Sequence, residues 1–262
     1  MPFFTRNQFR QHYQVIEGVV PRDTLFLHGN LASNLWWEPS IEYWKSFSKG
    51  SGRLILAEWR GCGESKEFVG GLDLNTLAQD TIDLMDHLNM KKGHLVGHST
   101  GCLIGLHAMA RAPHRFEKAV LLDPVHPEGI QFGPEMRAAF LQMSKDRNFA
   151  AQIILSTIHG GSLSETFRQR IVDACFQVAP AIWEGVPNFL ANAPTLETSN
   201  LQLPILVAHG ELDAVLPMEK SEQLAKELPQ GKMLRLDQRG HCCNVEDPER
   251  FVRFTHDFLF PA

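Results

Sequence analysis

The sequence predicts an α/β domain in which a mostly parallel sheet is covered by helices and carries a helical insertion. Short strand-like runs alternate with segments whose apolar residues recur every three or four positions. Such alternation is typical of parallel sheets with right-handed crossovers. Residues 118–124 form a continuous apolar run, as strands buried on both faces do. The alternation stops between about residue 126 and residue 200, where only helical patterns occur.

Length and charge limit the possible partners. A chain of 262 residues with 44% hydrophobic content is long enough for one domain with an insertion, whereas two full domains would be cramped. The formal net charge of -5 leaves no basic stripe for nucleic acid or an anionic membrane. We therefore expect a small neutral or weakly polar substrate, no nucleic-acid partner and no membrane partner, while the oligomeric state stays open.

The N-terminus and the cysteines bear on localisation and cofactors. Residues 1–6 lack the apolar run of a signal peptide and no segment reaches the length of a membrane span, which predicts a cytoplasmic protein. The five cysteines are scattered and odd in number, which argues against a disulfide framework. Cys242 and Cys243 lie beside His241 but lack metal-site spacing and a second ligand pair, so no metal is expected.

Strands and helices are expected on both sides of the insertion. Strand-like runs fall at residues 11–17, 24–27, 53–57, 92–96, 118–124, 203–210 and 232–236. The first helix has an apolar stripe made of Trp37, Ile41, Trp44 and Phe47. Further helical patterns cover residues 74–88, 102–111, 218–228 and 248–260.

The insertion is predicted to be a helical cap over the carboxyl edge of the sheet, where ligands bind in open α/β folds. We expect residues 1–127 and 199–262 to form the core domain and residues 128–198 to form the cap. Most apolar residues of the cap are expected to pack it onto the core. Its helical patterns span residues 134–143, 148–158, 165–178 and 181–190.

The most informative stretch is Gly97-His98-Ser99-Thr100-Gly101, a G-x-S-x-G sequence between a predicted strand and a predicted helix. A serine in such a turn takes strained backbone angles, and the small glycines let strand and helix approach closely. The hydroxyl then projects above the sheet edge. In this context we interpret Ser99 as a nucleophile rather than as part of an ordinary turn.

A serine nucleophile needs a base and a carboxylate that orients the base. His241 follows Gly240 after the last predicted strand, and Asp213 follows the strand at 203–210, so both can meet Ser99 at one edge. Asp123 also ends a strand and is the alternative acid, although the order Ser, Asp, His favours Asp213.

Three other histidines can lie near this edge. His98 is adjacent to the serine, and neighbouring side chains diverge in a tight turn, so it is a poor candidate for the base. His28 and His209 are expected to be structural and to hydrogen-bond the loop backbones.

An acyl-transfer intermediate carries an oxyanion that needs two preorganised donors, and the loss of one donor costs about 3 kcal/mol. The backbone N–H groups of Thr100 and Asn30 are the expected pair, and Leu31 replaces Asn30 if the turn is shifted by one residue.

These features, in this order, resemble the α/β-hydrolase family over nearly the whole chain. The resemblance rests on His28-Gly29-Asn30, the loop 59–65, the serine motif, the loop 210–217 and Gly240-His241. It implies an α/β-hydrolase fold with an eight-stranded, mostly parallel sheet and a helical cap. It also implies a Ser99, Asp213, His241 triad that acts through an acyl-enzyme without a cofactor. Glu58 departs from the family, which often has Asp at this position.

We expect a serine hydrolase that cleaves a small to medium carboxylic ester or lactone. Carbon–carbon bond hydrolases of meta-cleavage products, N-acyl-homoserine lactonases, amidases, aminopeptidases and cofactor-free perhydrolases share these residues and stay open. A ligand receptor on this scaffold is the alternative from another class. Dehalogenation is disfavoured, because haloalkane dehalogenases carry aspartate where Ser99 stands. The expected pocket side chains are aromatic: Trp36, Trp37, Phe140 and Trp183.

Overall fold

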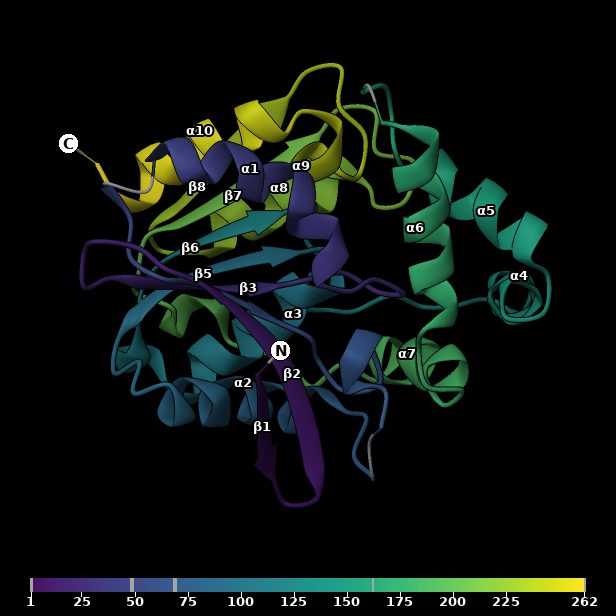
Figure 1. Ribbon diagram of the computed structural model, residues 1–262, viewed down its shortest axis with the longest axis horizontal. Helices are drawn as coiled ribbons and strands as arrows, with labels where there is room; N and C mark the ends of the chain where they lie inside the picture. Colours follow the sequence, from purple (N-terminus) through teal and green to yellow (C-terminus); the bar gives the residue numbers. More distant parts are fainter. Residues whose placement is uncertain (1, 48–49, 68–69, 162, 262) are drawn as a thin grey trace.

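The computed structural model describes residues 2–47, 50–67, 70–161 and 163–261. Within these ranges a single sheet of eight strands has the order β1-β2-β4-β3-β5-β6-β7-β8 (Figure 1). The two pairs β1–β2 and β2–β4 are antiparallel and the remaining pairs are parallel. The strands are β1 (Phe3–Arg6), β2 (Phe9–Ile16), β3 (Asp23–Leu27), β4 (Leu54–Ala57), β5 (Gly93–His98), β6 (Phe116–Leu122), β7 (Ile205–Gly210) and β8 (Gly231–Leu236).

Helices cover both faces of this sheet. Successive side chains of a strand point to opposite faces, so apolar strands present hydrophobic side chains on each face that helices can bury. In β3, Leu25 joins the core under α2, α3 and α8, whereas Phe26 joins the core under α1 and α10. The helices outside the insertion are α1 (Glu38–Phe47), α2 (Leu74–His87), α3 (Thr100–Arg111), α8 (Met218–Glu227), α9 (Cys243–Glu246) and α10 (Pro248–Leu259).

Four α-helices lie in the described part of the segment between β6 and β7. Figure 1 shows them grouped at one end of the sheet, beyond the carboxyl ends of the parallel strands. Buried side chains such as Ile154, Ile171 and Ile182 join them to the core on the side of α2 and α3. These helices are α4 (Pro134–Met143), α5 (Arg147–Ser156), α6 (Glu165–Phe176) and α7 (Ile182–Ala191).

The N-terminal edge of the sheet contains a strand that the sequence pattern did not indicate. β1 pairs with β2 through a two-residue turn at Asn7 and Gln8, whose φ angles are 48° and 67°. Hairpin turns with two positive φ angles usually contain glycine, so this turn has no sequence signal of the usual kind.

The described part of the chain contains no helix that is both long and apolar enough to cross a bilayer. All five cysteines are buried and free.

Candidate active site

The serine motif forms a sharp turn between β5 and α3. Ser99 has φ 54° and ψ -121°, a left-handed backbone conformation that is strained for a residue with a side chain. A Cβ atom at Gly97 would lie 2.8 Å from the Cys102 Cα atom, and one at Gly101 would lie 2.2 Å from the Leu27 carbonyl oxygen. Both positions therefore require glycine for helix α3 to start this close to β5 and β3.

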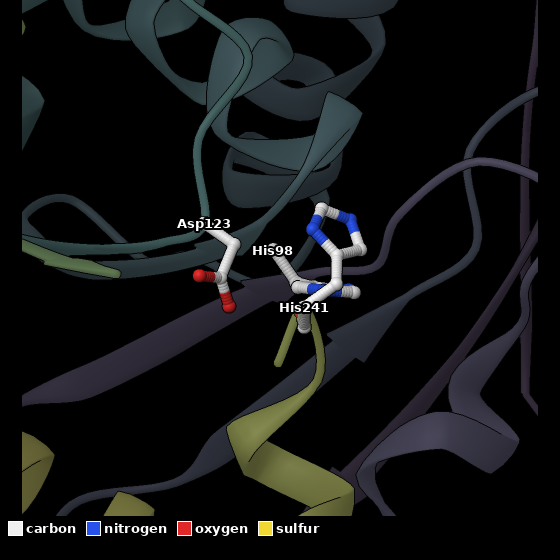
Figure 2. Close-up of side chains that lie close together, drawn as sticks. All are labelled: His98, Asp123 and His241. Atoms are coloured by element: carbon white, nitrogen blue, oxygen red, sulfur yellow. The ribbon is translucent and has the colours of Figure 1, made fainter. Parts of the chain in front are cut away.

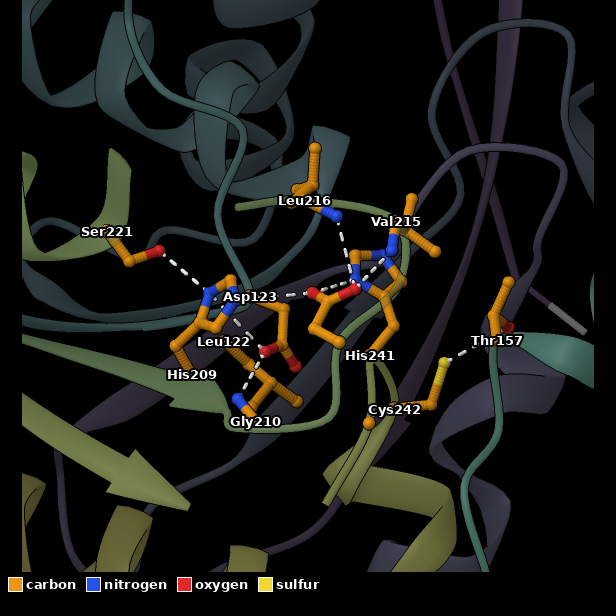
Figure 3. A network of polar contacts seen from close by, with 12 residues as sticks. Leu122, Asp123, Thr157, His209, Gly210, Val215, Leu216, Ser221, His241 and Cys242 are labelled. Carbon is orange, nitrogen blue, oxygen red and sulfur yellow. Dashed lines mark hydrogen bonds and ion pairs between the residues drawn. The ribbon is translucent and has the colours of Figure 1, made fainter. Parts of the chain in front are cut away.

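His241 and Asp213 form a hydrogen-bonded pair after β8 and β7. His241 Nδ1 lies 2.7 Å from Asp213 Oδ2, while Asp213 Oδ1 accepts the backbone N–H groups of Val215 and Leu216 at 2.7 and 3.1 Å (Figure 3). Burial pushes the pKa of Asp213 upward, but the hydrogen bond and the charge of His241 outweigh burial and leave this pKa below its ordinary value. An ionised Asp213 accepts a hydrogen bond from His241 Nδ1–H, which leaves Nε2 of the neutral ring free to act as an acceptor.

Ser99 and His241 line one cavity, together with Asn30 and Thr100. Among the described residues, the Ser99 hydroxyl makes no hydrogen bond to the His241 ring. Hydrogen bonds between catalytic groups are often long without substrate and tighten in the complex. The predicted nucleophile, base and oxyanion donors thus line the same cavity, and the predicted acid contacts the base through its Nδ1 atom.

The predicted oxyanion donors lie on the two sides of Ser99. Thr100 begins α3, so its N–H is one of the orphan donors at a helix start. Leu31 has φ 50° and donates its N–H to the Asn30 side-chain oxygen at 2.9 Å. Because this hydrogen bond already uses the Leu31 N–H, the Asn30 N–H is the better candidate for the second oxyanion donor.

Asp123 has a different environment from Asp213. It is fully buried at the end of β6, and its Oδ1 accepts the Gly210 N–H at 2.8 Å. Among the described residues its other oxygen, Oδ2, has no hydrogen-bond partner. Burial, reinforced by the charge of Asp213, raises the pKa of Asp123 well above its ordinary value. The pKa values of the two aspartates are therefore shifted in opposite directions, and of the two only Asp213 hydrogen-bonds the His241 ring.

His98 hydrogen-bonds the backbone of the loop that carries His241. Its Nε2 donates to the His241 carbonyl oxygen at 2.8 Å, and Figure 2 shows the two rings close together beside Asp123. Burial and the neighbouring His241 lower the pKa of His98 to about 3, which keeps its ring neutral. The ring faces the loop backbone, in agreement with the expectation that it is not the base.

The two histidines expected to be structural differ in their partners. His28 Nδ1 contacts the Gly29 carbonyl oxygen at 2.8 Å, as expected for a loop-stabilising residue. His209 contacts a side chain instead, because its Nδ1 lies 2.8 Å from Ser221 Oγ, on helix α8. The opposite edge of the His209 ring faces Asp213, with Nε2 at 3.5 Å from Oδ2.

Glu246 is a buried residue of the site that sequence reasoning missed. Its Oε2 accepts the Gly240 N–H at 2.8 Å, and its Oε1 accepts the N–H groups of Cys242 and His159 at 3.1 and 2.9 Å. One carboxylate thus holds the backbone on both sides of His241 and ties it to the segment after α5. The sequence offered no signal for this role, because Glu246 lies in a four-residue helix, α9, that was not expected.

The cavity beside Ser99 has a volume of about 460 Å³, which lies in the range of small-molecule sites. Of the four aromatic residues expected to line it, Trp36 and Phe140 do so. The prediction was wrong for Trp37 and Trp183, which are not among the lining residues.

The two misplaced tryptophans have clear packing reasons. Trp37 follows Trp36 in a tight helical turn (Asn34–Trp37), so its ring points to the other face of the sheet, 5.2 Å from the Phe26 ring and 5.9 Å from the Phe251 ring. Trp183 packs behind Phe140, with ring centroids 5.3 Å apart.

Two clusters of buried acids and histidines have metal-like spacing: His98, Asp123 and His241, and Asp123, His209 and Asp213. Hydrogen bonds already use His98 Nε2 and His241 Nδ1, and burial raises the pKa of Asp123, which disfavours its ionised form. Metal ligands must be deprotonated and free to donate a lone pair. We therefore assign these side chains to a hydrogen-bonded network.

A serine at a strand-to-helix turn, with an Asp–His pair after later strands of the same sheet, defines a class of α/β proteins built for nucleophilic chemistry. The model of the alpha/beta hydrolase family matches residues 24–254. The chain belongs to this family.

Individual relatives are distant. A protein of Agrobacterium fabrum, provisionally named carbamate hydrolase RutD, is 27% identical over 91% of this chain and 94% of its own length. The uncharacterized hydrolase YugF of Bacillus subtilis is 30% identical over 70% of this chain and 71% of its own. The crystal structure of carboxylesterase CesB (YbfK) from Bacillus subtilis has a TM-score of 0.83 at 22% identity, covers 99% of this chain and 91% of that one, and shows the shared fold.

Proposed function

We propose that this protein is a serine hydrolase that cleaves a small to medium carboxylic ester or lactone through an acyl-enzyme on Ser99. The single observation that carries the proposal is the convergence of Ser99 and His241 on one cavity, with Asp213 bonded to His241 Nδ1. The names of relatives such as carboxylesterase YbfK and a 3-oxoadipate enol-lactonase agree with this reaction class.

In this mechanism His241 Nε2 takes the Ser99 proton as Oγ attacks the substrate carbonyl carbon. The negative charge that develops on the carbonyl oxygen is stabilised by the N–H groups of Asn30 and Thr100. The bond between the carbonyl carbon and the leaving-group oxygen then breaks, and His241 returns the proton to that oxygen. Water, deprotonated by His241, then attacks the acyl carbon. The bond between this carbon and Ser99 Oγ breaks, His241 returns the proton to Oγ, and the acid is released. Asp213 keeps the ring in the required tautomer throughout.

We also propose that residues 128–198 act as a cap over this site. Support comes from the cavity wall, to which α4, α5 and α7 contribute Phe140, Ile154 and Leu190. A cap of this kind excludes water around the reacting carbonyl and shapes the acyl site.

The decisive experiment combines a fluorophosphonate probe with a serine variant. We expect the probe to label Ser99 in the wild-type protein, as read by peptide mapping, and Ser99→Ala to lose both labelling and ester hydrolysis. The hydroxyl contributes little to packing, so the melting temperature of the variant should be close to that of the wild type. An unlabelled Ser99, or a Ser99→Ala protein that retains most activity, would refute the mechanism and favour the receptor alternative.

A further inference from the structure

The wall of the cavity beside Ser99 carries no charged side chain of the Lys, Arg, Asp or Glu type within the described ranges of the chain. It is made mainly of apolar groups from the core and from the helices between β6 and β7. Six side chains illustrate the composition: Leu31, Val125, Phe132, Phe140, Met143 and Ile154. A ligand in this space meets hydrocarbon on most sides.

Two hydroxyl groups of the cavity wall already donate hydrogen bonds within the protein. The Ser156 hydroxyl donates to the Ile153 carbonyl oxygen at 2.7 Å, and the Thr157 hydroxyl donates to the Ile154 carbonyl oxygen at 2.7 Å. His98 Nε2 donates to the His241 carbonyl oxygen, while His98 Nδ1 and Trp36 Nε1 are buried without a hydrogen-bond partner among the described residues. The pKa of His98 is lowered to about 3, so none of these polar groups is a cation that could pair with an anionic ligand.

Electrostatics in this space disfavour an anion. No lysine or arginine of the described residues lines the cavity, and the charge nearest to the base is the carboxylate of Asp213, which is hydrogen-bonded to His241. A carboxylate on the substrate would lose its hydration without gaining a partner and would also be repelled by Asp213. Burying an unpaired charge costs several kcal/mol even after the protein relaxes.

The outer rim is apolar as well. Met136 on α4, Ile153 on α5 and Val215 after β7 line the cavity while 50%, 38% and 47% of their surfaces are exposed. Exposed apolar side chains around an opening are typical of ligand-binding grooves. A hydrocarbon chain too long for the interior can continue along this rim without meeting a charged wall.

We propose that the substrates are uncharged esters or lactones with an apolar acyl chain, and that the cavity rejects chains that end in a carboxylate. This inference rests on the proposed function. It adds the charge of the substrate to the proposed function, because Ser99, His241 and Asp213 alone do not distinguish neutral from anionic substrates.

The first test compares three p-nitrophenyl esters with acyl chains of similar length: the hexanoate, the monoester of adipic acid and its methyl-capped diester. We expect kcat/KM for the two neutral esters to exceed that for the anionic ester by about 100-fold at pH 7.5, since the anion loses hydration without a partner. Uncatalysed hydrolysis is subtracted for each ester. Equal values, or a preference for the anionic ester, would overturn the inference.

The second test places a cation in the rim. Ile153→Lys should raise kcat/KM for the anionic ester and narrow the neutral-to-anionic ratio by about tenfold relative to Ile153→Gln. The gain should shrink as salt increases, because exposed charges are screened. Ile153 is partly exposed, so both variants should fold, and Ile153→Gln controls for lost apolar surface. An unchanged ratio in Ile153→Lys would contradict the proposal.

A wrong serine mechanism and a wrong inference about substrate charge would give different experimental results. If the fluorophosphonate probe does not label Ser99, the serine mechanism is wrong whatever the ester ratios are. If Ser99 is labelled and the anionic ester is cleaved as well as its methyl-capped analogue, the mechanism survives and the inference about charge is wrong.

Discussion

Two aspartates lie near His241, and their surroundings assign them different roles. Asp213 accepts the His241 ring and two backbone N–H groups, whereas Asp123 accepts only the Gly210 N–H and leaves one oxygen unpaired. The sequence order favoured Asp213 but kept Asp123 as an alternative. The hydrogen bonds explain this preference, because a carboxylate orients an imidazole only when it contacts the ring nitrogen.

The first prediction concerns this pair. Asp213→Asn should lower kcat by roughly 10⁴-fold, because an amide stabilises the wrong imidazole tautomer. Asp123→Asn should keep most of the activity, because within the described residues Asp123 makes no hydrogen bond to the His241 ring and the amide has the same shape as the acid. Steady-state kinetics on a p-nitrophenyl ester measure both. If Asp123→Asn proves to be the inactive variant, the assignment of the acid must be reversed.

At the scale of elements, the loop that carries His241 is fixed by a single buried carboxylate. Glu246 is 6% exposed and accepts three backbone N–H groups, two of which flank the base. Burial raises the pKa of Glu246, and the hydrogen bonds from His159, Gly240 and Cys242 oppose this shift.

The second prediction follows for Glu246→Gln. An amide presents a donor where a backbone N–H needs an acceptor, so the loop loses at least one bond and kcat should fall by about tenfold or more. Unfolding free energy should drop by about 1–3 kcal/mol. If Glu246 only stabilised the fold, the folded molecules of Glu246→Gln would have the same kcat as the wild type. Glu249→Gln, at an exposed position on α10, is the control for loss of charge.

The third prediction concerns the start of helix α3. Gly101→Ala should destabilise the fold by about 1–3 kcal/mol, because the new methyl group would meet the rigid carbonyl oxygens of Leu27 and His28 at 2.2 and 2.5 Å.

Gly105→Ala, one turn later in α3, is the matched control. The added methyl group meets the flexible Leu95 side chain at 2.7 Å, and alanine is the better helix former by about 1 kcal/mol. Urea unfolding of both variants measures the difference. Equal losses would show that contact with the backbone is not the reason for Gly101.

Strands and long helices were predictable because their apolar periodicity is strong. The helix expected at residues 134–143 has the same bounds as α4, and the five core strands β3 to β7 fall within a few residues of their expected positions. The hairpin at Asn7 and the short helix α9 were not predictable, since both are set by tertiary contacts. The direction of the Trp37 side chain depends on the phase of a single tight turn, which periodicity over longer windows does not reveal.

At the scale of the whole molecule, the buried acid Asp123 links stability to pH. In the folded state its pKa is raised, whereas an unfolded aspartate has a pKa near 3.9. Between these values the folded state binds a proton that the unfolded state has released. This contribution is therefore fully present below about pH 4 and declines as the pH rises toward the folded pKa.

The fourth prediction compares wild type with Asp123→Asn across pH. The amide has no proton to lose, so the stability of the variant relative to wild type should increase by up to about 1.4 kcal/mol for each pH unit above pH 4. Other titrating groups cancel in this difference. Denaturant unfolding at pH 5 and pH 7 measures it. A difference that stays constant between these values would contradict a raised pKa of Asp123 in the folded protein.

The helices between β6 and β7 are bonded directly to the backbone of the catalytic loop. The His241 N–H donates to the Thr157 carbonyl oxygen at 3.2 Å, and Glu246 joins the same loop to His159. A rigid-body opening of these helices would break these bonds and move His241, the proposed general base. Met136 and Val215 line the cavity and are partly exposed, so we expect reactant to enter and product to leave beside them while these helices stay in place.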